Sequence, residues 1–411
     1  MKNILSALFA VALFFPIKPL LAQDTLSVVT NDTLPDQQPV TAAPEKTSFK
    51  VAVFAPMYLD SVFINGALRT GNSVPRFIMP AVEFAQGAAI AFDTLRLNGK
   101  TAEAFIYDSR SYIRPISWLI ANHLLDHIDL IIGSVKDPDY RELAYFSKQK
   151  NIPFVSATYP NDGGVTETPG MIIVNSTLKS HCEGIFSYLL QKHGTDKIYL
   201  VKKKGDERIE NYLKEINVRD GKPLLNIKTI PIDSSISSYA LWRRIDTTVA
   251  TVIIGATLNE PLAKNITDAS YSIQKKHPLT LIGMPNWDGF KIFGKKDAYT
   301  DFPILFTSPH YDGHANLFSD YLIDKYYQLY RARPSDMAYK GFELTYFFTN
   351  LLLHYPSNMM DHLNDPQFSV IHDFNFIPIF LDNKNSSVPD YYENKHLFIM
   401  HILNGEIDRE W

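Results

Sequence analysis

The stretch from residue 130 to residue 158, LIIGSVKDPDYRELAYFSKQKNIPFVSAT, decides the fold. It opens with the apolar run Leu130 to Ile132, which closes at Gly133. The segment Tyr140 to Lys150 follows with a helical pattern, and Ile152 to Ser156 is a second apolar run. A strand, a helix and a strand in this order form a βαβ unit, in which both strands lie parallel in one sheet. The sequence therefore predicts an α/β protein.

The same alternation is present upstream. Val51 to Phe54 is a short apolar run, and the segment Phe84 to Leu95 has helical spacing and ends at Asn98-Gly99. Ala104 to Tyr107 predicts the next strand, and Ile113 to Leu125 predicts the next helix. Together with the first stretch, these segments predict a parallel sheet with covering helices.

A second series of βα units begins after an interruption at Gly163-Gly164 and Pro169-Gly170. Its strands are predicted at Ile172–Val174, Ile198–Val201, Ile227–Ile230, Val252–Ile254 and Leu279–Ile282, and its helices at Leu178–Lys192, Glu207–Ile216, Tyr239–Asp246 and Pro261–Lys275. Two separate series of this kind predict two similar lobes.

The N-terminus has the anatomy of a secretory signal peptide. Lys2 precedes an apolar run from Ile4 to Phe15, and Ala22 precedes the polar Gln23. We expect residues 1–22 to be removed by cleavage after Ala22, residues 23–47 to form a flexible leader, and the mature chain to be periplasmic. The apolar run is shorter than the roughly 20 residues that span a bilayer, so an uncleaved anchor is the weaker alternative and no membrane insertion of the mature chain is expected.

Composition and motifs exclude several classes of function. The formal net charge is -4 and the basic runs are short, so no nucleic-acid partner is expected. The nucleophile elbow, the Walker loop and the zinc-protease helix are absent, which predicts a protein that is not an enzyme and needs no cofactor. Cys182 stands beside His181, but neighbouring residues on a helix point about 100° apart and do not form a catalytic pair. His310 and His314 flank a predicted turn, so no metal site is expected.

Four stretches resemble the type I periplasmic binding proteins related to branched-chain amino-acid receptors. They are Phe84–Ala91, Ile131–Thr158, Val252–Glu260 and Asp336–Glu343. The resemblance implies a two-lobed fold in which each lobe is a parallel sheet flanked by helices, with three hinge crossings. It implies a first lobe of residues 48–171 plus 286–345 and a second lobe of residues 172–285 plus 346–411.

The candidate ligand site lies at the carboxyl ends of the predicted strands, where loops and helix N-termini expose hydrogen-bond donors. Ser134, Ala157 and Thr158 could hold a ligand carboxylate, and Tyr159 could wall the pocket. Glu260 could hold an ammonium group, since the stretch that ends there is similar in spacing to a family strand near a ligand-contacting glutamate.

Asp206 is the candidate from the second-lobe loop Lys203–Glu207. The alternative for Ser134 and Thr158 is a helix cap or turn hydroxyl, and for Glu260 an ordinary acidic residue in a first helical turn.

Two functions remain open. The first is an exported solute-binding protein that closes two lobes on a small polar ligand, amino-acid-like or peptide-like, and feeds an ABC transporter permease. The second is a non-catalytic envelope protein linked to peptidoglycan machinery, without a small ligand. Beyond Ser357 the runs Phe374–Leu381 and Leu397–Ile402 predict two added strands. In this tail the chain is similar to a Bacteroidetes-type branch of the family.

Overall fold

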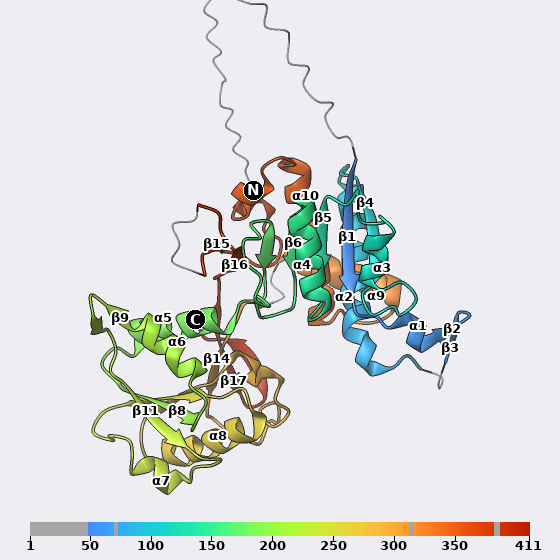
Figure 1. The fold of residues 1–411 in the computed structure, drawn as a ribbon. Coiled ribbons are helices and arrows are strands. Elements are labelled where there is room, and N and C mark those ends of the chain that lie inside the picture. The colour runs from blue at the N-terminus through green and yellow to red at the C-terminus, as the bar shows by residue number, and fades with distance from the viewer. Residues whose placement is uncertain (1–47, 70–72, 312–315, 382–386) are drawn as a thin grey trace, which may run out of the picture. The chain divides into compact units, whose positions relative to one another are not determined.

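The computed structural model describes residues 48–69, 73–311, 316–381 and 387–411. The predicted signal peptide and the whole predicted leader lie outside these residues. Within them the chain forms two seven-stranded sheets, each flanked by helices (Figure 1). The predicted fold class, two lobes built from βα units, is confirmed.

The first sheet has the strand order β15-β16-β7-β6-β5-β1-β4. Its strands are β1 (Phe49–Ala55), β4 (Ala102–Asp108), β5 (Leu130–Gly133), β6 (Phe154–Ser156), β7 (Met171–Ile173), β15 (Phe376–Ile379) and β16 (Tyr391–Asn394). All neighbouring pairs are parallel except β15 with β16.

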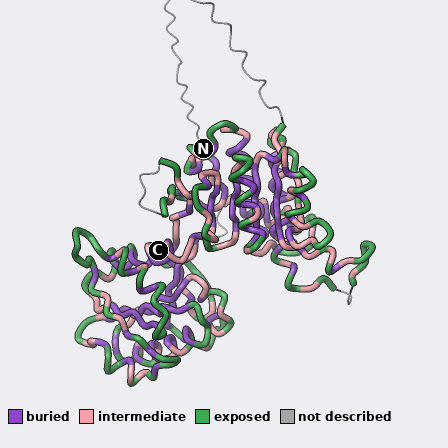
Figure 2. Tube along the Cα trace, viewed as in Figure 1, coloured by how far each residue is buried: buried purple, intermediate pink, exposed green. Residues whose placement is uncertain are grey.

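Both faces of the inner strands β1, β5, β6 and β7 of the first sheet are buried, which explains the continuous apolar runs in their sequences. Along β1, Val51 and Val53 point into a core shared with α2 (Met79–Leu97) and α10 (Asp336–His354). Ala52 and Phe54 point into the opposite core, with α3 (Ile116–Ala121) and α4 (Asp139–Lys150). Alternate residues of a strand face opposite sides of the sheet, so both sides of β1 must be apolar. Figure 2 shows the buried strand interiors.

The α2 and α10 helices approach closely because a glycine stands on each at the contact. A Cβ atom on Gly87 would lie 2.0 Å from the carbonyl oxygen of Ala338, and one on Gly341 would lie 2.0 Å from that of Phe84. These glycines are therefore required by backbone packing. The helix α9 (Leu317–Tyr330) packs beside this pair.

The second sheet has the strand order β11-β8-β12-β13-β14-β17-β18. Its strands are β8 (Lys197–Lys203), β11 (Ile227–Ile232), β12 (Thr251–Ala256), β13 (Leu279–Ile282), β14 (Ile304–Ser308), β17 (Phe398–Leu403) and β18 (Glu406–Arg409). The last two pair antiparallel. Four helices accompany it: α5 (Leu178–Lys192), α6 (Arg208–Ile216), α7 (Ser238–Trp242) and α8 (Glu260–Gln274).

Short elements complete the described fold. They are α1 (Leu59–Val62), the hairpin of β2 (Phe63–Ile64) and β3 (Ala67–Leu68), the hairpin of β9 (Val218–Arg219) and β10 (Lys222–Pro223), and the 3-10 helices η1 (Arg76–Ile78), η2 (Pro285–Gly289), η3 (Met359–His362) and η4 (Pro366–Phe368).

The chain passes between the two sheets three times in the described fold, after β7, after β14 and after β16. This number agrees with the three hinge crossings that the family resemblance implies. The sheets divide the sequence differently from the predicted lobe boundaries, however. Strand β7 completes the first sheet by pairing with β6, and β14 belongs to the second sheet because it pairs with β13. Of the tail, β15 and β16 extend the first sheet, and β17 and β18 extend the second.

Candidate functional site

Ser134 and Thr158, two of the predicted site residues, lie together at the carboxyl ends of β5 and β6. Their hydroxyl oxygens are 3.2 Å apart. The backbone N–H of Ser134 donates to Phe54, and that of Ala157 donates to Gly133, so both are used by the sheet. These two N–H groups are therefore not available to cradle a ligand carboxylate.

Ala157 and Tyr159 flank Thr158 in the chain, whereas Asp206 and Glu260 come from separate segments of the second lobe. The hydroxyl of Tyr159 donates to Asp137 Oδ2 at 3.3 Å. Asp206 and Glu260 are both exposed, and Glu260 opens α8 behind the cap Asn259. The structure thus brings together Ser134 and Thr158 but not the whole predicted set.

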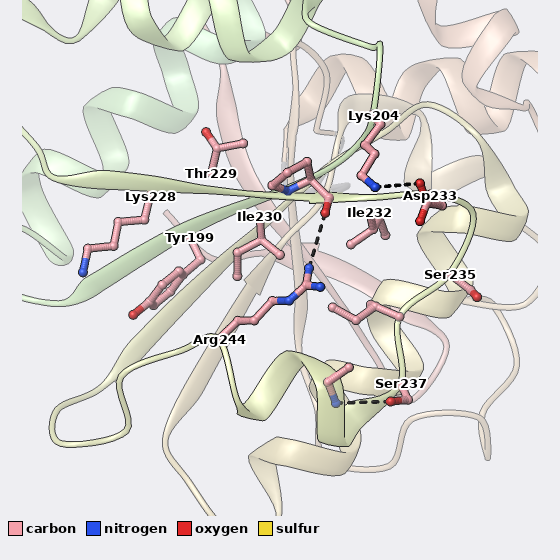
Figure 3. A pocket seen from close by; sticks show the side chains of 13 residues that line it. Tyr199, Lys204, Lys228, Thr229, Ile230, Ile232, Asp233, Ser235, Ser237 and Arg244 are labelled. Carbon is pink, nitrogen blue, oxygen red and sulfur yellow. Dashed lines mark hydrogen bonds and ion pairs between the residues drawn. The ribbon is translucent and has the colours of Figure 1, made fainter.

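A cavity of about 650 Å³ lies beside the edge strand β11 (Figure 3). Three charged side chains on its wall, Lys204, Asp233 and Arg244, already have partners. Lys204 Nζ lies 2.9 Å from Asp233, and Arg244 donates to the carbonyl of Pro231 at 3.3 Å. Pro231 has no N–H to offer a further strand, so this edge is protected. Size alone does not make it the best candidate.

A second cavity, of about 370 Å³, lies at the carboxyl ends of β6, β7, β12, β13 and β14. Ligands of open α/β sheets bind at such strand ends, and the volume suits a small molecule. We call it the hinge pocket, because two of the three crossings line it. Its lining residues are Pro160, Asn161, Asn175, Ser176, Leu178, His181, Arg208, Leu258, Pro285, Asn286, Asp288, Thr307, Ser308, Pro309, His310 and Lys340.

Trp287 fixes one wall of the hinge pocket. Its ring is fully buried over Gly283, where an added Cβ would lie 2.2 Å from the ring, and its Nε1 donates to the carbonyl of Thr257 at 2.8 Å. The residues on either side, Asn286 and Asp288, line the cavity. A buried anchor between two lining residues holds both in place.

Asn286 presents an unused acceptor in this wall. Its Nδ2 donates to the carbonyl of Leu258 at 2.9 Å, while its Oδ1 is buried and has no hydrogen-bond partner among the described residues. Because the amide is anchored through one atom, its other atom is positioned to accept a hydrogen bond from a ligand.

The hinge pocket also carries basic groups. Arg208 is exposed, and it makes no hydrogen bond or ion pair within the described chain. His181 instead is satisfied, with Nδ1 2.8 Å from the hydroxyl of Thr307, and its burial lowers its pKa to about 3. His181 is therefore a neutral structural residue, whereas Arg208 is available to an anionic group.

Comparison with known proteins identifies the fold. No family model and no curated protein sequence matches the chain. Among solved structures, one assigned as a branched-chain amino acid ABC transporter from Rhodospirillum rubrum has a TM-score of 0.62 at 12% identity, covering 88% of this chain and 100% of that one. The fold is that of the type I periplasmic binding proteins.

Two further structures agree. A branched-chain amino acid ABC transporter periplasmic ligand-binding protein from Burkholderia xenovorans has a TM-score of 0.58 at 11% identity, covering 88% of this chain and 94% of that one. An ABC transporter substrate-binding protein from Desulfitobacterium hafniense, in complex with Leu, has a TM-score of 0.53 at 13% identity, covering 88% and 100%. Among the described residues, no helix is long and apolar enough to span a membrane.

One group of side chains has the composition of a metal site. Single donor atoms of His310, Glu343 and His372 lie within 4.8 Å of one another. However, His372 Nδ1 is 2.6 Å from Glu343 Oε2, and its Nε2 accepts the N–H of Tyr311 at 3.0 Å. Both nitrogens of His372 are thus engaged in holding the second crossing to α10. Of His310 and His314, at which no metal site is expected, His314 lies outside the described residues.

The surroundings of Cys182 agree with the expectation that it does not act as a nucleophile. Cys182 is fully buried, and burial raises the pKa of its thiol to about 12. The Nδ1 of His181 contacts Thr307. The thiol is therefore a buried apolar group in the core of the second lobe.

Sequence reasoning missed most of the polar residues that line the hinge pocket. Asn286, His310 and Lys340 come from three distant segments and follow no common spacing. A usable signal was present for Asn286, since it precedes a tryptophan directly after a predicted strand. Lys340 stands in Asp336–Glu343, one of the stretches that carry the family resemblance, but the resemblance gives it no role in a site.

Proposed function

We propose that this chain is an exported, non-catalytic solute-binding protein that closes its two lobes on a small polar ligand in the hinge pocket. The observation that carries the proposal is the Oδ1 of Asn286, a buried and anchored acceptor without a partner, in the wall of a cavity at the strand ends. Burying such an atom unpaired costs about 1–3 kcal/mol, which a ligand N–H donor would offset.

Hinge bending is the proposed mechanism. The pocket receives Pro160, Asn161 and Lys340 from the first lobe, and Asn286 and Arg208 from the second. A ligand that contacts both sets favours the closed arrangement by its differential affinity for it. The ligand class is amino-acid-like or peptide-like, and delivery to an ABC permease in the periplasm is the proposed role.

The predicted site residues enter this proposal as neighbours of the hinge pocket. Asn175, which lines it, donates to the carbonyl of Thr158 at 2.8 Å, and Thr158 contacts Ser134. We propose that these hydroxyls, with Ala157 and Tyr159, support the first-lobe wall. Asp206 and Glu260 are proposed as rim residues at the loops beside Arg208 and Leu258.

The test is a binding screen on the mature protein after unfolding, removal of any bound ligand and refolding. Thermal shift is measured against amino acids, short peptides, muropeptides and small sugars, and hits are quantified by calorimetry. A ligand at about 100 times its dissociation constant adds roughly 2.7 kcal/mol to stability.

Asn286→Leu should weaken binding about tenfold. Ser235→Ala on the wall of the edge cavity is the control and should bind normally. A well-folded protein without any hit would favour the envelope scaffold instead. Mass spectrometry of the exported chain tests cleavage after Ala22.

A further inference from the structure

His310 is an unsatisfied buried imidazole. Both of its ring nitrogens are buried and have no hydrogen-bond partner among the described residues. Burial lowers the pKa of His310 well below its ordinary value, and the nearby Lys340 ammonium acts in the same direction. The ring is therefore neutral, with one N–H to donate and one lone pair to accept.

This lack of partners sets His310 apart. Of the described buried side-chain atoms without a hydrogen bond, most are hydroxyl oxygens, and Asp139 Oδ2 is ion-paired with Arg110. The remaining atoms belong to Asn286 and His310, and both residues line the hinge pocket. The unpaired amide oxygen and the unpaired imidazole nitrogens thus all lie at one cavity, as expected where a ligand completes the hydrogen bonds.

Lys340 adds a positive charge beside His310. It projects from α10, makes no hydrogen bond or ion pair with another described residue, and lines both the hinge pocket and an adjoining cavity of about 280 Å³. Desolvation lowers the pKa of its ammonium, and the carboxylates of Asp336, Asp288 and Glu343 act in the opposite direction. An ammonium without an ion-pair partner in a largely dehydrated place is costly unless an anion joins it.

We propose that Lys340 and His310 form the anchor for a carboxylate of the ligand. This inference rests on the proposed function and specifies its ligand class. The Lys340 ammonium supplies the charge, and the His310 N–H supplies a directed hydrogen bond to the same anionic group. Asn286 Oδ1 then accepts from a separate N–H group of the ligand. An amino acid or a short peptide with a free C-terminus satisfies both requirements.

The anchor is distinct from the hydroxyls expected from the sequence. Ser134 and Thr158 contact each other, and the N–H groups at Ser134 and Ala157 belong to the sheet. A carboxylate in the hinge pocket instead meets the second crossing and α10. Because α10 belongs to the first sheet's core and His310 follows β14 of the second sheet, binding there links the carboxylate to lobe closure.

The experiment compares acids with their carboxamides. Each amino acid or dipeptide that binds is measured by calorimetry beside the same compound with its carboxylate converted to an amide, on the wild type, Lys340→Met, Lys340→Arg and His310→Phe. The control is Lys228→Met, which removes an exposed lysine from the wall of the edge cavity.

We expect the amide to bind the wild type 10–100 times more weakly than the acid. We expect Lys340→Met to remove this preference, Lys340→Arg to keep part of it, and Lys228→Met to leave it unchanged. Without ligand, Lys340→Met should unfold at the same temperature as the wild type or higher, because it removes a partly desolvated charge that lacks an ion-pair partner among the described residues. Lower stability with an intact preference for the acid would identify Lys340 as structural and overturn the anchor.

Other outcomes separate the two proposals. If ligands bind but acid and amide bind equally, the anchor is wrong and the solute-binding function stands. If nothing in the panel binds to a folded wild type, the solute-binding function fails and the anchor fails with it.

Discussion

Replacing Gly283 with alanine should damage the hinge pocket through Trp287. The added Cβ would lie 2.2 Å from Cε3 and 2.3 Å from Cδ2 of the indole, far inside ordinary contact distance. The ring is fully buried, so it has no solvent to move into, and it must shift within the core. Overpacking of this kind costs about 1–3 kcal/mol, and loss of the Nε1 hydrogen bond to Thr257 adds about 1 kcal/mol.

The expected loss of unfolding free energy is therefore about 2–4 kcal/mol, measured by urea unfolding with circular dichroism. Gly289→Ala is the matched control. Gly289 lies in η2 together with Trp287, and an added Cβ there would meet no atom within 4 Å. This variant should stay within about 0.5 kcal/mol of the wild type. Displacement of Trp287 should also weaken ligand binding through Asn286. If the two variants were equally stable, the lack of a side chain at Gly283 would not be what allows the Trp287 ring to pack there.

Three further predictions follow from other parts of the fold. Gly341→Ala should destabilise the first lobe by about 2 kcal/mol or more, because its Cβ would lie 2.0 Å from the carbonyl oxygen of Phe84; urea unfolding measures this, and wild-type stability would contradict it. The depressed pKa of His181 means that the unfolded chain binds a proton that the folded chain excludes, so stability falls as pH decreases from about 6.5 toward 3, by up to about 1.4 kcal/mol per pH unit. His181→Gln should flatten that slope between pH 6.5 and 5, and an unchanged slope would assign it to other groups. Lys395→Met should loosen the third crossing, because the Lys395 ammonium lies 2.8 Å from Glu183; faster amide hydrogen exchange at residues 394–398 is expected, and unchanged exchange would argue against this role.

The local sequence pattern predicts the ends of an element correctly where capping residues next to that element determine them. The helix α5 begins and ends where it was predicted, because Thr177 caps its first turn through Ser180 and the helical spacing continues to Lys192. The predicted helix from Ile113 to Leu125 is shorter in the structure, running from Ile116 to Ala121. Pro115 sets its start, and the backbone at His123 has a positive φ of 59°, which ends helical geometry.

Strand β16 shows why other elements were not predicted. Its sequence, Tyr-Tyr-Glu-Asn, has no apolar alternation, yet Glu393 is only 2% exposed. The Glu393 carboxylate accepts from the backbone N–H of Thr177 and from the hydroxyl of Ser180, and it lies 3.2 Å from the Lys395 ammonium. Partners more than two hundred residues away make this polar strand suitable for burial. No window of sequence contains that information.

Some residues of the candidate site could also be placed from local sequence, and others could not. Ser134 and Thr158 could be placed at strand ends because each follows an apolar run, and they do meet. The Lys340–His310 pair could not be placed, because α10 and the crossing after β14 come together only when both sheets have formed. A polar residue inside an apolar helix is usually satisfied by a neighbour, as Glu343 of α10 is by His372 from the segment that follows η4. Lys340 is half-buried one helical turn before Glu343 and has no such neighbour among the described residues. This difference between two charges on one helix makes a bound anion the expected partner of Lys340.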